Sequence, residues 1–143
     1  MTRIIGICIA ILVGWIGWIV YEQWSKTAAE QELSQVEYDH AHAAVEAMNP
    51  RTLHGIPDKM RDKMEDTLQK AQQNGAVGLR EWLKIYSKFV EDPRLGWIQL
   101  DYAVLVARDS PGEAKRVFHE VKDRTPPTSP IYPRIKLLEK AYE

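Results

Sequence analysis

The sequence predicts an all-α protein, in which a single N-terminal transmembrane helix precedes a small domain of helical hairpins. Three observations lead to this fold class. An uncharged apolar run occupies residues 4–21, later apolar residues recur at helical spacing, and no segment has the alternating pattern of a strand. We expect a transmembrane anchor at 1–21, a long helix leaving the membrane at 22–50, and a helical-hairpin domain at 57–143.

The apolar run reads IIGICIAILVGWIGWIVY, eighteen residues without a charge. As a helix it would be roughly 27 Å long, which matches the hydrocarbon thickness of a bilayer. A cleaved signal peptide has a shorter apolar core and then a small-x-small site, but here Glu22, Gln23 and Trp24 follow. The sequence therefore predicts an uncleaved anchor, with Tyr21 and Trp24 at the far membrane interface.

Orientation depends on the charges beside the run. Arg3 is the only charged residue before Glu22. A short positive head in front of an apolar run is typical of a signal anchor. We therefore expect a single-pass membrane protein with a cytoplasmic N-terminus and its helical domain on the extracytoplasmic (periplasmic) side.

Small residues form a stripe within the span. Gly6, Ala10 and Gly14 recur every four residues, and Gly17 lies close to the same stripe. Such spacing lets a second helix approach closely in lipid, which predicts a packing face for another membrane subunit or a second copy. The alternative is that glycine and alanine are simply common in membrane helices.

The first helix after the membrane should continue to about Met48, where Asn49-Pro50 ends it. At about 100° per residue, one broad face collects its apolar residues. These are Leu33, Val36, His40, Ala44, Ala47 and Met48.

Proline and glycine then divide the chain into five further helices. Pro57 opens one that Asn74-Gly75 closes, with the apolar stripe Met60, Met64, Leu68 and Ala71. The next runs from about Ala76 to Glu91 and buries Leu79, Trp82, Leu83, Tyr86 and Val90. Asp92-Pro93 opens a helix with the apolar residues Trp97, Ile98, Leu100, Val104, Leu105 and Ala107. A capping box, Ser110-x-x-Glu113 with proline at the first helical position, opens the fourth of these helices, and Pro130 opens the last.

The helix-opening prolines Pro57, Pro93 and Pro130 are 36 and 37 residues apart, which predicts stacked helical hairpins. Residues 97–126 carry Trp97-x2-Leu100, then Ala114-x3-Phe118, then Pro126. This pattern resembles a tetratricopeptide repeat, although Asp101 stands in its glycine position and Val104 in its tyrosine position.

The resemblance implies a concave surface, built from the first helix of each pair, that binds a peptide of a partner protein. It places Trp97 in the core and Ile98, Tyr102 and Leu105 in the groove. The layout is also similar to that of small bacterial proteins with one anchor and an extracytoplasmic tetratricopeptide domain. Those proteins associate with translocation, secretion or cofactor-assembly machinery.

Catalytic and cofactor-binding patterns are missing from the sequence. His40 and His42 would lie about 160° apart on a helix, which prevents them from sharing a metal ion. Cys8 lies in the apolar run, and the sequence contains no HExxH, CxxC or phosphate-binding glycine loop. A net charge of −1 does not favour nucleic acid. We predict no enzyme activity, no cofactor and no metal.

Two functions remain. One is a membrane-tethered interaction module, a helical-repeat adaptor or scaffold that binds a partner peptide. The alternative is a small accessory or stabilising subunit of a larger membrane complex, such as a respiratory, photosynthetic or translocation assembly. The expected partners are the lipid bilayer and either another membrane subunit or a peptide of a partner protein.

Overall fold

The computed structural model describes residues 34–142, and within them it contains α-helices and short 3₁₀ turns but no strand. The predicted span 4–21, its stripe Gly6, Ala10, Gly14 and Gly17, and the interface residues Tyr21 and Trp24 lie outside the described residues. No helix within residues 34–142 is long and apolar enough to cross a membrane. The all-α class is therefore confirmed for the described residues.

The chain divides after His40 into two units, and residues 34–40 of the first are a helical segment with exposed side chains. The helix continues to Ala47, so Asn49-Pro50 ends it as predicted. The predicted apolar face contacts the core only in part, because Val36, His40, Ala44 and Ala47 are exposed. Met48 of that face packs against the core, together with Val45, which the prediction did not include. These two side chains offer more apolar surface than the two alanines, and they lie on one helical face.

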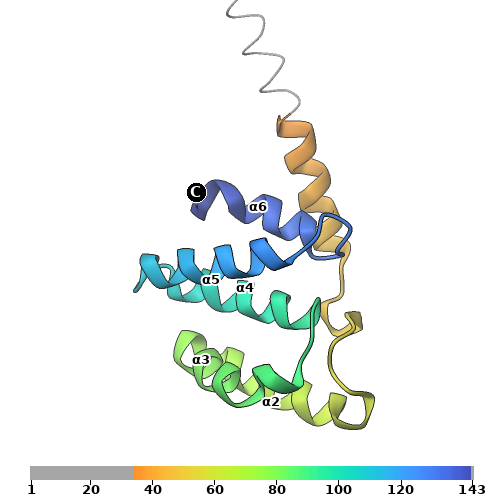
Figure 1. Ribbon diagram of the computed structural model, residues 1–143, viewed down its shortest axis with the longest axis vertical. Coiled ribbons are helices and arrows are strands. Elements are labelled where there is room, and N and C mark those ends of the chain that lie inside the picture. The colour runs from red at the N-terminus through yellow and green to blue at the C-terminus, as the bar shows by residue number, and fades with distance from the viewer. Residues whose placement is uncertain (1–33, 143) are drawn as a thin grey trace, which may run out of the picture. The chain divides into compact units, whose positions relative to one another are not determined.

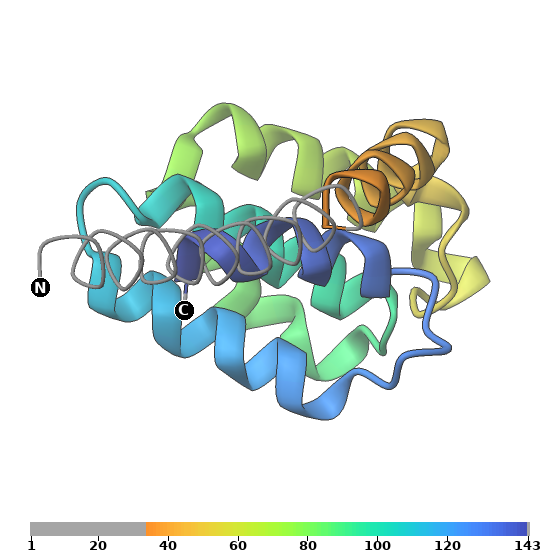
Figure 2. The ribbon, with the colours of Figure 1, turned by 90° about the horizontal axis from the view of Figure 1, so that it is seen from above.

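The second unit is built from consecutive antiparallel helices. They are α2 (Arg61–Gln73), α3 (Gly75–Tyr86), α4 (Arg94–Val106), α5 (Pro111–Arg124) and α6 (Tyr132–Tyr142). Figure 1 shows the pair α4/α5 between the pair α2/α3 and the single helix α6. Seen from above in Figure 2, α2 and α5 lie on opposite sides of α6. The predicted antiparallel helix pairs are thus present.

The first pair turns at Asn74, which ends α2 and begins α3. Gly75 takes the positive φ of 67° that this turn requires, as expected for glycine after a helix. Gly78 lets the two helices pack closely, since an added Cβ there would lie 2.4 Å from the Ala71 carbonyl oxygen. Met60 is exposed rather than part of the buried stripe, because it ends a 3₁₀ turn, Asp58–Met60, before α2 begins.

The second helix of that pair ends earlier than predicted. α3 stops at Tyr86, a 3₁₀ turn follows at Ser87–Phe89, and Val90 is extended and buried. Beyond it, the Glu91 amide donates to the Gly55 carbonyl at 2.8 Å and the Arg94 amide to the His54 carbonyl at 3.1 Å. The first bond takes an amide that a continuing helix would have used internally, and the second satisfies the amide at the start of α4, which has no partner within its own helix.

The second helix of the next pair begins where expected, with Pro111 at the first position of α5. The predicted capping box was wrong, because the Ser110 side chain caps nothing and Glu113 bonds to Tyr102 and Arg80 instead. In α4, Trp97, Ile98 and Leu100 are buried, but Val104 and Leu105 are exposed. α6 completes the core with Ile135 and with Tyr142, whose ring stacks on Phe118 at 5.1 Å between centroids.

Candidate functional site

Two adjoining hollows lie in the second unit, and together they are called the groove. The first, about 380 Å³, is bounded by α2, α4 and residues 49–51. The second, about 270 Å³, is bounded by α2, α3, α4 and α6. Gln72 and Asp101 line both hollows, and their side chains are hydrogen-bonded to each other where the two hollows adjoin.

Helical spacing places the lining residues. α2 contributes Glu65, Gln69 and Gln72, and α4 contributes Arg94, Trp97, Asp101, Val104 and Leu105. Steps of three and four residues put each set on one face of its helix. α2 and α4 are the first helices of their pairs, and Arg134 of α6 extends the same series.

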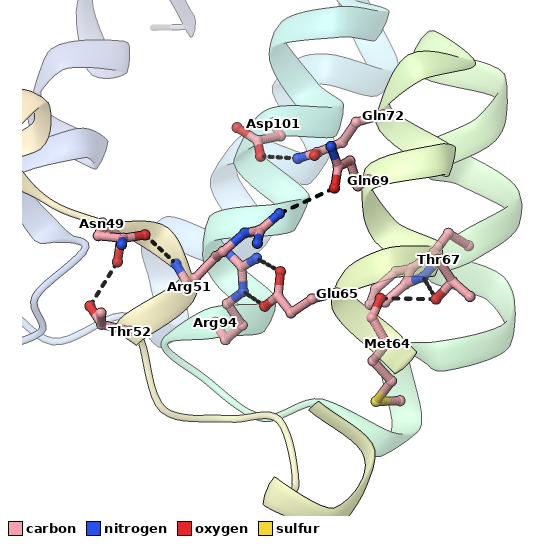
Figure 3. A network of polar contacts seen from close by, with 11 residues as sticks. Asn49, Arg51, Thr52, Met64, Glu65, Thr67, Gln69, Gln72, Arg94 and Asp101 are labelled. Carbon is pink, nitrogen blue, oxygen red and sulfur yellow. Dashed lines mark hydrogen bonds and ion pairs between the residues drawn. The ribbon is translucent and has the colours of Figure 1, made fainter. Parts of the chain in front are cut away.

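A buried ion pair forms the base of the first hollow (Figure 3). Arg94 donates from Nη2 to Glu65 Oε2 at 2.7 Å and from Nε to Oε1 at 3.0 Å. The Arg94 and Glu65 side chains are 4% and 11% exposed. The two-point geometry satisfies both charges where water is largely excluded, and it fixes α4 against α2.

Arg134 joins α6 to the other end of the groove. Its Nη2 lies 2.5 Å from Asp101 Oδ1, and its Nη1 donates to the Trp97 carbonyl at 3.3 Å. The guanidinium carbon is 4.1 Å from the centroid of the Trp97 ring, a cation–π contact. Three contacts from one side chain therefore hold α6 beside α4.

Carboxamides line the rim of the first hollow. Arg51 Nη2 donates to Gln69 Oε1 at 3.2 Å, and Gln72 Nε2 donates to Asp101 Oδ2 at 3.3 Å (Figure 3). Asn49 Oδ1 accepts from the Arg51 amide at 3.1 Å and thereby shapes the short 3₁₀ turn Pro50–Thr52. Amide groups of this kind can both donate and accept, which suits recognition of a peptide backbone.

The structure separates the three residues that the family resemblance placed in the groove. Leu105 is 42% exposed and lines the second hollow, whereas Ile98 is 0% and Tyr102 4% exposed. The physical reason is the rotation of α4. Arg94, Trp97, Asp101 and Leu105 face the groove, so Ile98 and Tyr102 point into the helix stack. Trp97 is buried as the resemblance implied, and it also lines the groove.

Tyr102 belongs to a polar cluster with α3 and α5. Its hydroxyl donates to Glu113 Oε1 at 2.5 Å and accepts from Arg80 Nε at 2.8 Å, while Arg80 Nη2 lies 2.9 Å from Glu113 Oε2. The bond from Tyr102 lowers the pKa of the Glu113 carboxyl. Burial raises the pKa of Tyr102, and its hydroxyl in turn raises the pKa of Arg80. These groups link three helices and do not line either hollow.

Sequence reasoning missed the polar residues of the groove, above all Arg51, Gln69, Gln72 and Arg134. One signal was available: Asp101 is the only charged residue in the mostly apolar stretch Trp97–Val106, and it stands where the repeat pattern has glycine. A charge in such a place needs a partner, and Arg134 provides it.

Metal and histidine chemistry has no assembled site in residues 34–142. No group of three His, Cys, Asp or Glu side chains there could hold a metal ion. His40, His42, His54 and His119 are all exposed, on separate segments apart from the first two.

Comparison with known proteins gives no relative for this chain. No protein-family model, no curated protein and no solved structure matches it.

Proposed function

We propose that this protein is a membrane-tethered protein–protein interaction module, a helical-repeat adaptor or scaffold without catalytic activity. The observation that supports it most is the groove, which is lined mainly by side chains from α2 and α4, the first helices of the two pairs, and is extended by Arg134 of the single helix α6. The tetratricopeptide-like pattern of residues 97–126 is consistent with such a stack.

The surface chemistry of the groove suits a peptide. Its first hollow has carboxamides and an exposed arginine, and its second has the exposed apolar side chains of Val104 and Leu105. Concave sites with apolar walls and a few placed polar groups are the usual form of a binding site. The bound segment would be extended, so that its backbone could reach the amides of Gln69 and Gln72.

The tether is the predicted span, Ile4 to Tyr21, and in this proposal the helical domain lies on the extracytoplasmic side. An alkaline wash of the membranes should leave the protein in the pellet. Protease added outside the cytoplasm should digest the domain; a fully protected domain would reverse the orientation.

A matched pair of variants tests the adaptor. Leu105→Asp places a charge in the second hollow, and Ile85→Asp places one on the outer face of α3, where Ile85 is 56% exposed and lines neither hollow. Both residues lie in the last turn of their helices, so the cost to helix stability should be alike.

Full-length tagged protein would be extracted from its native membrane in mild detergent, and its co-purifying chains identified and quantified. The adaptor proposal expects Leu105→Asp to lose the partner and Ile85→Asp to keep it. Equal recovery of the partner with both variants would refute the groove as the binding surface.

The small-residue stripe of the span favours a second candidate, an accessory subunit of a larger membrane complex. Replacing Gly6, Ala10 and Gly14 by leucine should then release the protein from a stable, stoichiometric assembly. An adaptor would instead keep its partner when the whole span is exchanged for an unrelated one.

A further inference from the structure

The groove contains three arginines, and two of them are neutralised. Arg94 is paired with Glu65, and Arg134 with Asp101. Arg51, at the rim of the first hollow, has no carboxylate partner among residues 34–142 and donates one hydrogen bond to the Gln69 carboxamide. The polar half of the groove therefore presents one uncompensated positive charge.

Arg51 is also held in position from two directions. Its backbone amide is bound by Asn49 Oδ1, and Thr52 Oγ1 donates to the Asn49 carbonyl at 2.8 Å (Figure 3). Its guanidinium is oriented by Gln69 on α2. A guanidinium carries five N–H donors, so most of those of Arg51 remain available. They can donate to the two oxygens of a carboxylate, in the two-point geometry that arginine and carboxylate favour.

The adjoining hollow has a different chemistry. Val104 and Leu105 expose apolar surface there, and the wall behind them is the fully buried Leu79. An extended peptide passing Gln72 and Asp101 would leave the cationic rim and enter this apolar pocket. The two hollows thus select different side chains at separate positions of one segment.

We propose that the groove binds an extended segment of a partner protein that carries a carboxylate, at Arg51, and an apolar side chain, at Leu105. The inference rests on the proposed function and adds the chemistry of the partner. The carboxylate belongs to an Asp, a Glu or a chain terminus of the peptide, and the apolar side chain lies a few residues away along it.

The test is selection from a degenerate peptide library on full-length protein in non-ionic detergent. Wild type should enrich Asp or Glu over Asn or Gln at one position and an aliphatic residue at another. Arg51→Glu should reverse the first preference toward Lys and Arg and leave the aliphatic preference unchanged. Arg116→Glu is the matched control, because Arg116 is exposed on α5 and lines neither hollow.

The selected peptide would then be synthesised with its acid replaced by the amide. Its dissociation constant for wild type should rise roughly three- to tenfold, the range for one charge-assisted contact at an exposed site. The difference should shrink in high salt, which screens exposed charges.

The possible results separate the two proposals. Enriched peptides without an acidic preference, or a preference that Arg51→Glu leaves unchanged, would overturn the carboxylate inference while the groove remained a binding site. Failure of wild type to enrich any peptide over Leu105→Asp would overturn the proposed function, and the inference with it.

Discussion

At the residue scale, Arg94 and Glu65 form the more deeply buried of the two ion pairs described in the groove. Replacing Glu65 by leucine would leave a guanidinium buried without its carboxylate. We expect Glu65→Leu to lower the free energy of unfolding by about 3–5 kcal/mol. Urea unfolding of the full chain in detergent, followed by far-UV circular dichroism, would measure it.

Combining Glu65→Leu with Arg94→Met is the control for that prediction. Two apolar side chains of similar volume can replace a buried ion pair at little cost. The double variant should therefore recover most of the lost stability. If Glu65→Leu alone lowered the free energy of unfolding by less than about 1 kcal/mol, the ion pair would be hydrated in solution and would not stabilise the packing of α4 on α2.

The cluster of Arg80, Tyr102 and Glu113 predicts how stability depends on pH. The pKa of Glu113 is lowered from 4.5. Its contribution to the free energy of unfolding is therefore present above pH 4.5 and is lost as the pH falls through the lowered pKa. The pKa of Tyr102 is raised from 10.0. Its contribution to the free energy of unfolding is therefore present below pH 10.0 and is lost as the pH rises through the raised pKa.

Tyr102→Phe removes the hydroxyl that both shifts depend on. The melting temperature of wild type should exceed that of the variant by a constant amount between the two ordinary pKa values. The difference should narrow toward either extreme of pH. A difference that stays constant into acid would show that the Tyr102 hydroxyl does not bind the ionised Glu113 carboxylate.

At the scale of the element, the connection between α3 and α4 depends on Gly55. Its φ is 130°, and an added Cβ would lie 2.1 Å from the Glu91 carbonyl oxygen. Gly55→Ala should therefore lower the free energy of unfolding by about 2–4 kcal/mol, since both backbone strain and a clash oppose it.

Gly112→Ala is the matched control for this substitution. Gly112 lies in the first turn of α5, and nothing would be within 4 Å of an added Cβ. Alanine there should raise stability by up to about 1 kcal/mol, because it favours the helix. Equal effects of the two substitutions in urea unfolding would mean that residues 54–55 do not pack against residues 91–94 in solution.

Element boundaries could be predicted where one residue type sets them locally. Pro111 opens α5, and Asn74-Gly75 makes the turn between α2 and α3. Boundaries set by distant partners could not be predicted. The end of α3 depends on Glu91 bonding to Gly55, and the failed capping box depends on Tyr102 and Arg80 holding Glu113.

In the groove, too, local sequence patterns predict some features, and contacts between distant residues decide the others. The spacing of apolar residues on α4 identifies a helix with a buried side, but the rotation of that helix is decided by both of its neighbours. Hence Leu105 lines the second hollow, while Ile98, which the resemblance also assigns to a partner groove, is in the core. The polar lining needs pairs such as Asp101 with Arg134, which are 33 residues apart in the chain and have no local pattern.

At the scale of the second unit, stability should be graded along the stack. α4 and α5 are covered on both sides, by α3 and by α6, whereas α6 packs on α5 and is tied to α4 through Arg134. In stacked helical pairs, each element is stabilised chiefly by its neighbours. α6 should therefore open more readily than α4 and α5, by local unfolding that leaves the central pair intact.

Native-state hydrogen exchange on the full chain would measure this gradient. We expect slow exchange in α4 and α5 and faster exchange in α6. Arg134→Met removes the ion pair and the cation–π contact but keeps an apolar side chain over Trp97, so it should speed exchange in α6 by about tenfold, as loss of roughly 1.4 kcal/mol would. Exchange in α2 should not change, because both hydrogen bonds of the Arg134 side chain described in residues 34–142 go to α4. If all five helices of the unit exchanged together in wild type and variant, they would unfold as one cooperative body, and α6 would be an integral part of the groove rather than its most labile wall.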